Sequence, residues 1–326
     1  KMLVMYGIGG ILIWLAIKKQ YEPMLLLPIG FGAILVNLPL SIAWEHEGIP
    51  GFLRILYEAG IANELFPILI FIAVGAMIDF GPLFRNPLMI FFGAAAQFGI
   101  FATMIVATLL GFDLKTAASI GIIGAADGPT AIYVANKFAR DYLAPISVAA
   151  YSYMSLVPII QPPVIRLLTT KQERSIHMPL HEKQSPQWLK ILFPILVTMT
   201  SGIVAPISVP LVGSLMFGNL IRESGVVERL SQVAQNELAY LVTLLLGISI
   251  GGSMSAEKFL NFDTLLILAM GLVAFIFDTA GGVLFAKLVN MFLPKEKKIN
   301  PMIGACGISA FPMSARVIQK LSLIHI

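Results

Sequence analysis

The chain has 326 residues, of which 57% are hydrophobic and 12% charged, and its mean hydropathy of +0.86 excludes a soluble globular domain. Its net charge of +4 comes from short loops and not from a basic stripe with interleaved aromatic residues, which argues against nucleic-acid binding. A single cysteine, Cys306, excludes an intrachain disulfide and a cysteine-cluster metal site. The composition is typical of an all-α polytopic membrane protein.

Apolar stretches predict about ten membrane segments. The N-terminus lacks a basic region and a cleavage site, so the first stretch is predicted to be part of a shortened first helix and not a signal peptide. Two stretches, 115–138 and 301–318, are interrupted by Gly and Pro and are predicted to be broken helices. The continuous stretches are 2–17, 24–40, 61–77, 88–110, 142–168, 189–204, 209–221, 238–250 and 262–292.

The two halves of the chain resemble each other weakly but in a consistent order. Residues 27–37 align with residues 209–219, and this alignment pairs Asn37 with Asn219. The two interrupted stretches also occupy equivalent places. Corresponding Gly/Pro-interrupted segments are the best sequence indication of a transporter site near the bilayer midplane.

This resemblance predicts two membrane repeats with inverted topology. The first repeat covers 1–168 and the second covers 188–326, each with one broken helix. The polar segment 169–187 is the one plausible linker, and we expect it in the cytoplasm.

The run Gly124-Ala-Ala-Asp127-Gly-Pro-Thr130 places a carboxylate beside Gly and Pro inside an apolar stretch. Gly and Pro break the helix, and the freed backbone groups need partners that lipid cannot supply. An ionised Asp there costs at least about 2.5 to 3.5 kcal/mol on insertion scales, so Asp127 is predicted to face a cavity, a cation or a transferable proton. The alternative is a helix-cap aspartate that only satisfies backbone amides.

An alkali cation needs several hard oxygen ligands. Asp127 supplies charge, Asn300 and Ser309 supply neutral oxygens, and the two breaks expose carbonyls, so the sequence predicts a site for one monovalent cation. When the cation leaves, Asp127 is expected to take up a proton, because burial disfavours the charged carboxylate. Asn300 and Ser309 also have structural interpretations, since Asn-Pro starts turns or helices and Ser packs well between membrane helices.

Other polar residues carry weaker signals. Asp278 is a second acid inside an apolar stretch, and both a hydrogen bond to a neighbouring helix and a functional role stay open. His177 and His181 have helix-like spacing but flank Pro179 in a polar loop, so a metal site there is not favoured. The sequence has no phosphate-binding loop, no nucleophile elbow and no lysine in the setting that carries covalent biotin, which excludes ATP-driven pumping by this chain alone.

Three motifs resemble, in order, the beta subunit of sodium-pumping, biotin-dependent decarboxylases. The family includes membrane subunits of oxaloacetate, glutaconyl-CoA, methylmalonyl-CoA and malonate decarboxylases, and the resemblance covers nearly the whole chain. The motifs are Gly124-Ala-Ala-Asp-Gly-Pro-Thr-Ala131, Tyr153 ahead of Val157-Pro-Ile-Ile-Gln-Pro-Pro163, and Asn300-Pro-Met-Ile-Gly-Ala-Cys-Gly-Ile-Ser-Ala-Phe-Pro-Met-Ser-Ala-Arg316.

The resemblance implies a carboxybiotin decarboxylase that exports Na⁺ across a bacterial or archaeal cytoplasmic membrane and consumes a proton. It implies that biotin is carried on a separate subunit, and that the partners are a carboxyltransferase/biotin-carrier subunit, a small membrane subunit and membrane lipid. Homo-oligomerisation within that complex stays open.

The resemblance also implies roles for five residues. Asp127 is the essential acid at the Na⁺ site, and Asn300 and Ser309 are the polar residues of the second broken helix associated with it. Tyr153 takes part in proton or Na⁺ handling. Arg316 serves activity near carboxybiotin, where a planar guanidinium is well suited to a carboxylate.

Family members are expected to continue past Ile326 with a further membrane helix, so the second repeat is predicted to lack its last helix. Two other functions stay open from the residues alone. One is a cation/proton antiporter or a Na⁺-coupled carboxylate carrier, which would work without a biotin partner. The other is a non-catalytic membrane scaffold. The acid whose carboxyl group is transferred also stays open, because that choice belongs to another subunit.

Overall fold

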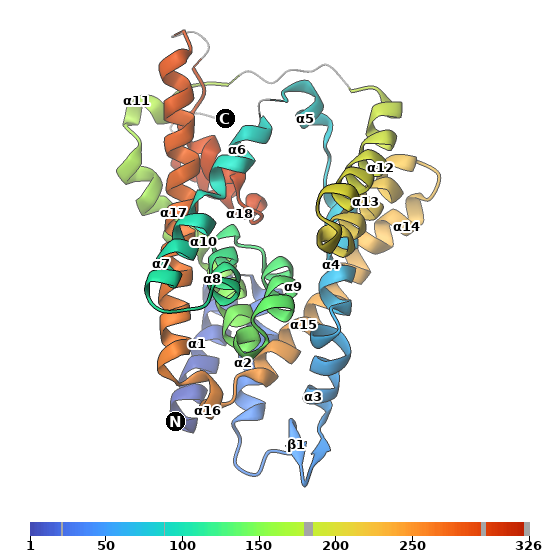
Figure 1. The fold of residues 1–326 in the computed structure, drawn as a ribbon, viewed down its shortest axis with the longest axis vertical. Coiled ribbons are helices and arrows are strands. Elements are labelled where there is room, and N and C mark those ends of the chain that lie inside the picture. The colour runs from blue at the N-terminus through green and yellow to red at the C-terminus, as the bar shows by residue number, and fades with distance from the viewer. Residues whose placement is uncertain (21, 88, 179–184, 295–297, 323–326) are drawn as a thin grey trace. The chain divides into compact units, whose positions relative to one another are not determined.

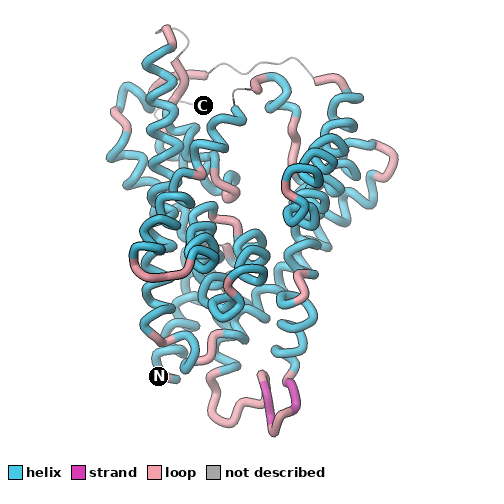
Figure 2. Tube along the Cα trace, in the orientation of Figure 1, coloured by secondary structure: helices cyan, strands magenta, loops and turns pink. Residues whose placement is uncertain are grey.

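The chain folds almost entirely into helices in a computed structural model that describes residues 1–20, 22–87, 89–178, 185–294 and 298–322 (Figure 1). Figure 2 shows the single strand pair of the described residues, an antiparallel hairpin of β1 (Glu45–His46) and β2 (Ile49–Pro50). Its two turn residues, Glu47 and Gly48, both have positive φ, at 49° and 82°. This is the geometry of the tight hairpin turns that favour Gly.

The helices form two compact units, and each unit combines two separate stretches of the chain. Unit 1 contains 1–86 and 182–260, and unit 2 contains 87–181 and 261–326. This spatial division differs from the division into sequence repeats, since each unit takes helices from both halves. The repeats therefore stay a prediction.

Unit 1 contains the following helices, in which η1 and η5 are π-helices and η4 is a 3₁₀ turn: α1 (Met2–Lys19), α2 (Pro23–Val36), α3 (Phe52–Leu56), η1 (Tyr57–Ala62), α4 (Leu65–Met77), α5 (Gly81–Arg85), α12 (Gln187–Val204), η4 (Pro206–Ser208), α13 (Val209–Ser224), α14 (Glu228–Val233), η5 (Ala234–Leu238), α15 (Ala239–Ser253) and α16 (Ala256–Phe259). Within it, α2 packs on α15 and α13 packs on α4. Gly32 permits the first close approach, because a Cβ there would lie 2.6 Å from the Ile248 carbonyl oxygen.

Unit 2 is built around the long helix α17 (orange in Figure 1). Its elements, in which η2, η3 and η7 are 3₁₀ helices, are α6 (Met89–Ala96), α7 (Phe98–Leu109), α8 (Leu114–Gly121), η2 (Ile122–Ala125), α9 (Gly128–Phe138), η3 (Arg140–Tyr142), α10 (Leu143–Leu168), α11 (Lys171–Arg174), α17 (Phe262–Phe292), η7 (Pro301–Gly307) and α18 (Phe311–Leu321).

One buried apolar cluster of unit 2 contains residues from both predicted breaks. Ala126 comes from the first break, Ile308 and Ala310 from the second, and all three have 4% or less of their surface exposed. This shared core fixes the two breaks in one unit. Its other members include Ala96, Val157, Ile165, Phe275, Val283, Met302, Ala305, Val317, Ile318 and Leu321.

Five helices of the described residues are long and apolar enough to cross a membrane, and the number rises to seven if each of two bent pairs is one span. The predicted number of about ten exceeds this count, since other apolar stretches form shorter helices than the ~20 residues that a span requires. Pro23–Val36, for example, has 14 residues. The five are Met2–Lys19, Met89–Leu109, Gln187–Val204, Glu228–Ser253 and Phe262–Phe292.

Candidate functional site

The first interrupted stretch breaks at Ala126 and Asp127. Ala126 adopts a left-handed φ of 52°, and Asp127 is extended at φ −127°, before α9 begins at Gly128. The sequence explains the position of the break. Pro129 has no N–H and its ring would clash with the carbonyl of Ala125 in a continuous helix, whereas the first turn of a new helix accepts Pro readily.

Asp127 is the N-cap of α9. Its Oδ1 accepts a hydrogen bond from the Thr130 N–H at 3.2 Å, and its Oδ2 accepts one from the Thr130 hydroxyl at 2.6 Å. The Ser309 side chain adds a third hydrogen bond. A carboxylate has about four acceptor positions, so capping leaves capacity for a further ligand. Asp127 is half-buried and Ser309 is exposed.

The second interrupted stretch meets the first at Ser309. The η7 helix ends at Gly307, the chain is extended at Ile308, and α18 begins at Phe311. The Ser309 N–H donates to the carbonyl of Ala125, the last residue of η2, at 3.0 Å. The structure thus brings Asp127 and Ser309 together through both backbone and side chain.

Asn300 lies apart from this pair. Its side-chain amide donates to the carbonyls of Arg174 and Ile176, each at 3.1 Å, and its oxygen accepts from the Met302 N–H at 3.2 Å. The seven residues of η7, with a rise of about 2 Å each, separate it from Ser309. Asn300 therefore fixes the start of η7 in this conformation.

Tyr151, two residues before the predicted Tyr153, lies at the first break. Tyr151 is fully buried, and a Cβ on Gly128 would collide with its ring. It also interacts electrostatically with Asp127. Residues two apart on a helix point about 200° away from each other, and Tyr153 lies instead at Gly271 of α17, where Ile123 of η2 also packs. The contact of Tyr151 with Gly128 follows from tertiary packing, and the role of Tyr153 stays a prediction.

The other two predicted residues lie elsewhere in unit 2. Tyr153 donates its hydroxyl to the Leu268 carbonyl of α17 at 2.5 Å. Arg316 is exposed on α18, and none of the described residues forms a hydrogen bond or ion pair with its guanidinium. Tyr153 thus holds α10 against α17, and Arg316 is available to an incoming anion.

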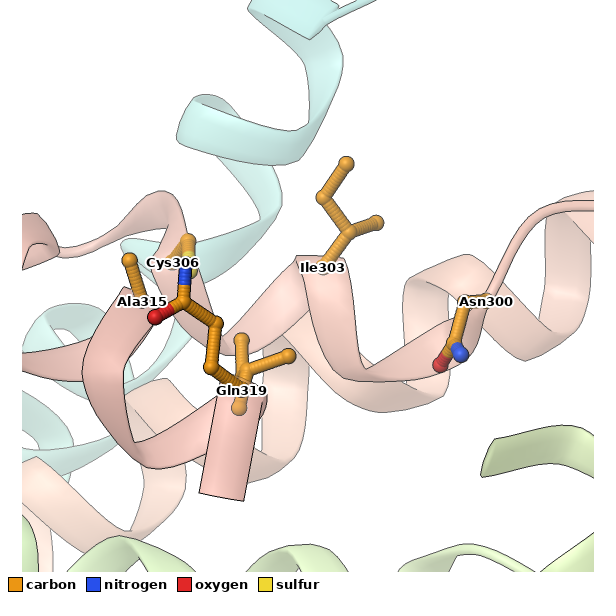
Figure 3. Close-up of a pocket in the computed structure, with 6 residues that line it drawn as sticks. Asn300, Ile303, Cys306, Ala315 and Gln319 are labelled. Atoms are coloured by element: carbon orange, nitrogen blue, oxygen red, sulfur yellow. The ribbon is translucent and has the colours of Figure 1, made fainter. Parts of the chain in front are cut away.

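A cavity of about 150 Å³ lies between η7 and α18. Figure 3 shows Asn300 at one end of η7 and Cys306 near the other. Its lining is mostly apolar, with the Cys306 thiol and two amide side chains as the polar groups. The lining residues are Asn300, Ile303, Cys306, Ala315, Ile318 and Gln319.

Within the described ranges, no three His, Cys, Asp or Glu side chains form a group that could hold a metal ion. His181 lies outside those ranges, so the expectation that His177 and His181 form no metal site stays untested. Among the described residues, Thr130 and Ser309 form the hydrogen bonds to Asp127 and bring no second acid, which suits a monovalent ion better than a divalent one.

A family model described as "Na+-transporting oxaloacetate decarboxylase beta subunit" matches residues 1–325. The chain belongs to this family. Its relatives include the methylmalonyl-CoA decarboxylase subunit beta of Veillonella parvula and the glutaconyl-CoA decarboxylase subunit beta of Acidaminococcus fermentans, each 51% identical over 97% of this chain and 82% of the relative. The oxaloacetate decarboxylase beta chain of Klebsiella pneumoniae is 44% identical over 98% of this chain and 87% of its own length.

As a beta subunit of the Na⁺-pumping decarboxylases, the chain decarboxylates carboxybiotin and couples this reaction to Na⁺ translocation. It is a multi-pass membrane protein of this bacterial family and one subunit of a larger complex. This membership favours the decarboxylase interpretation over the antiporter, carrier and scaffold alternatives.

Proposed function

We propose that Asp127 binds Na⁺ and H⁺ in turn and that this exchange couples decarboxylation to transport. The supporting observation is the contact between a half-buried carboxylate in one helix break and Ser309 in the other. The affinity for an ion that binds both residues depends on the relative position of the two breaks. Movement of one break against the other therefore changes the affinity for the ion, which any coupled pump requires.

The Na⁺ ligands in this proposal are the Asp127 carboxylate and the Ser309 hydroxyl. The third predicted ligand is Asn300, whose side-chain NH₂ group and oxygen are both hydrogen-bonded to backbone groups. It would have to release those bonds to reach an ion, so we assign it the positioning of η7. Tyr153 likewise acts through α17, because its hydroxyl is bonded to Leu268.

The chemical step consumes one proton for each carboxyl group. Cleavage of the N–C bond of carboxybiotin releases CO₂, and the ring nitrogen takes up the proton to give biotin. The proton taken up by the ring nitrogen is the one that replaced Na⁺ on Asp127. The exposed Arg316 guanidinium holds the carboxylate of carboxybiotin before cleavage, since its planar fork binds a carboxylate through two hydrogen bonds.

Biotin reaches this chain on a separate subunit. A carboxyltransferase/biotin-carrier subunit would load it with the carboxyl group of a carboxylic acid or acyl-CoA, and a small membrane subunit would complete the complex. Na⁺ leaves the cytoplasm in this scheme. The relatives' names include oxaloacetate, methylmalonyl-CoA and glutaconyl-CoA, and the choice among such donors belongs to the carboxyltransferase.

Substitution of Asp127 tests the proposal. In the purified complex, we expect Asp127→Asn to abolish Na⁺-stimulated decarboxylation of carboxybiotin and Ser309→Ala to weaken apparent Na⁺ affinity by about tenfold, the equivalent of about 1.4 kcal/mol. The matched control is Asp263→Asn, which removes an exposed acid of α17 bonded only to Tyr142 at 3.3 Å among the described residues. Undiminished Na⁺ stimulation in Asp127→Asn would refute the exchange.

A further inference from the structure

Asp278 lies near the middle of α17, and the site above does not use it. Its side chain is fully buried. Oδ1 accepts a hydrogen bond from the Ile100 N–H at 3.2 Å, and the Gly99 N–H also bonds to the carboxyl group. Both donors belong to the first turn of α7, where the Ile100 N–H also donates to the carbonyl of the N-cap residue Gln97 at 3.1 Å. One oxygen of Asp278 therefore caps a neighbouring helix.

The second oxygen, Oδ2, is buried without a hydrogen-bond partner among the described residues. It lies against Gly124 of η2, because a Cβ on Gly124 would collide with it. The same Cβ built on Gly124 would lie 2.9 Å from the Cβ of Ala274. A charged carboxylate with one bare oxygen in an apolar site costs several kcal/mol, whereas a neutral acid costs far less.

The elements packed around Asp278 bring no positive charge to it. The helices α6, α7 and η2 contain no titratable residue. Lys115 of α8 is exposed, and Lys287 of α17 bonds to Glu173 at 3.2 Å and to the Leu168 carbonyl at 3.0 Å. The other titratable groups of these elements are Tyr151 at Gly128, Tyr153 on Leu268, Cys306 in the cavity, and the exposed Arg166 and Asp263.

We propose that Asp278 is a second proton-binding site, distinct from Asp127, which holds its proton on Oδ2 while η2 packs against α17. The geometry favours a proton over Na⁺ for two reasons. Asp278 presents one free oxygen, and the two other atoms nearest to a Cβ built on Gly124 are carbons of Ala274. Na⁺ requires several oxygen ligands, whereas a proton requires one.

The protonation of Asp278 matters because its carboxyl group lies against Gly124. Gly124 lies in η2, three residues before Asp127 and directly ahead of the break. A neutral Asp278 lets η2 rest against α17, whereas an ionised one would place a bare charge against it. Asp278 is thus a positioning residue: its protonation state sets the placement of the break, and it does not contact the ion or the carboxybiotin.

Infrared difference spectroscopy of the purified complex tests the assignment separately from the roles of Asp127. At neutral pH and saturating Na⁺, which displaces the proton from Asp127, we expect the C=O stretching band of a protonated carboxylic acid in the wild-type spectrum, and we expect Asp278→Asn to remove it. The band should shift in ²H₂O and should not depend on Na⁺. Asp263→Asn, which removes an exposed acid from the same helix, is the matched control and should leave the band unchanged.

Two variants separate this role from a purely structural one. Asparagine reproduces the shape and neutrality of the protonated acid and retains the oxygen that caps α7, so Asp278→Asn should assemble and keep Na⁺-dependent turnover. Asp278→Ala removes the cap and should lower the thermal unfolding temperature further than Asp278→Asn. Absence of the band, its loss on addition of Na⁺, or failure of Asp278→Asn to assemble would each overturn the proposal.

Discussion

Asp127 is both a helix cap and the proposed ion-binding group, and the two roles are compatible at the level of single atoms. Thr130 and Ser309 occupy three of about four acceptor positions of the carboxylate. The cap fixes the carboxylate at the break, and the remaining position can bind an ion. The Tyr151 ring packs directly against Gly128, so there is no room for a side chain at the first residue of α9.

Gly128 should therefore not tolerate a side chain. We expect Gly128→Ala to destabilise the protein by about 1–3 kcal/mol through overpacking against the buried Tyr151 ring, and to reduce Na⁺-dependent turnover as the break is displaced. Thermal unfolding in detergent measures the first effect. Gly93→Ala is the matched control, because a Cβ there meets nothing within 4 Å. Equal stability of the two variants would contradict this packing.

At the scale of elements, the predicted linker is partly a packed structural element. Residues 170–174 form a capping box and the short helix α11, and the carbonyls of Arg174 and Ile176 hold Asn300 at the start of η7. Although partial burial acts to raise it, hydrogen bonds from Thr170 and the contact with Lys287 hold the pKa of the Glu173 carboxyl below its usual value. The ion pair between Glu173 and Lys287 thus attaches α11 to α17 within unit 2.

This attachment should depend on pH. A carboxyl group whose pKa is depressed in the folded state stabilises that state above its unfolded pKa, and the contribution is lost as pH falls through the folded pKa. We expect faster hydrogen–deuterium exchange of residues 169–176, after correction for intrinsic rates, as pH falls from about 7 to about 4. Glu173→Gln should show fast exchange already at the upper pH. Its retention of the wild-type profile would disprove the contribution of Glu173.

At the scale of the whole molecule, two aligned asparagines make corresponding contacts in unit 1. Asn37, at the end of α2, donates to the Met254 carbonyl at the end of α15 at 2.8 Å. Asn219 of α13 donates to the Ile78 carbonyl at the end of α4, also at 2.8 Å. Each half thus supplies one asparagine that binds the end of a helix from the other half. Such a correspondence is expected of two repeats, which stay a prediction.

Equivalent contacts should have similar energies. We expect Asn37→Ala and Asn219→Ala each to destabilise unit 1 by about 1–3 kcal/mol, because each leaves buried backbone carbonyls unpaired. Thermal unfolding of the single and double variants measures this. Asn236→Ala, an exposed residue bonded to its own helix, should change stability by less than about 0.5 kcal/mol. A large effect at only one of the two buried sites would argue against equivalence.

The membrane class, the two interrupted stretches and the acid at Asp127 can be predicted from the sequence, because composition and the helix-breaking effects of Gly and Pro act locally. The family also follows from the order of its motifs. Which polar residues meet depends on tertiary packing. It joined Ser309 to Asp127, bonded Asn300 to the segment after α11, directed Tyr151 and not Tyr153 to Gly128, and buried Asp278 against Gly124. These contacts depend on how distant helices pack, and spacing along the chain does not contain that information.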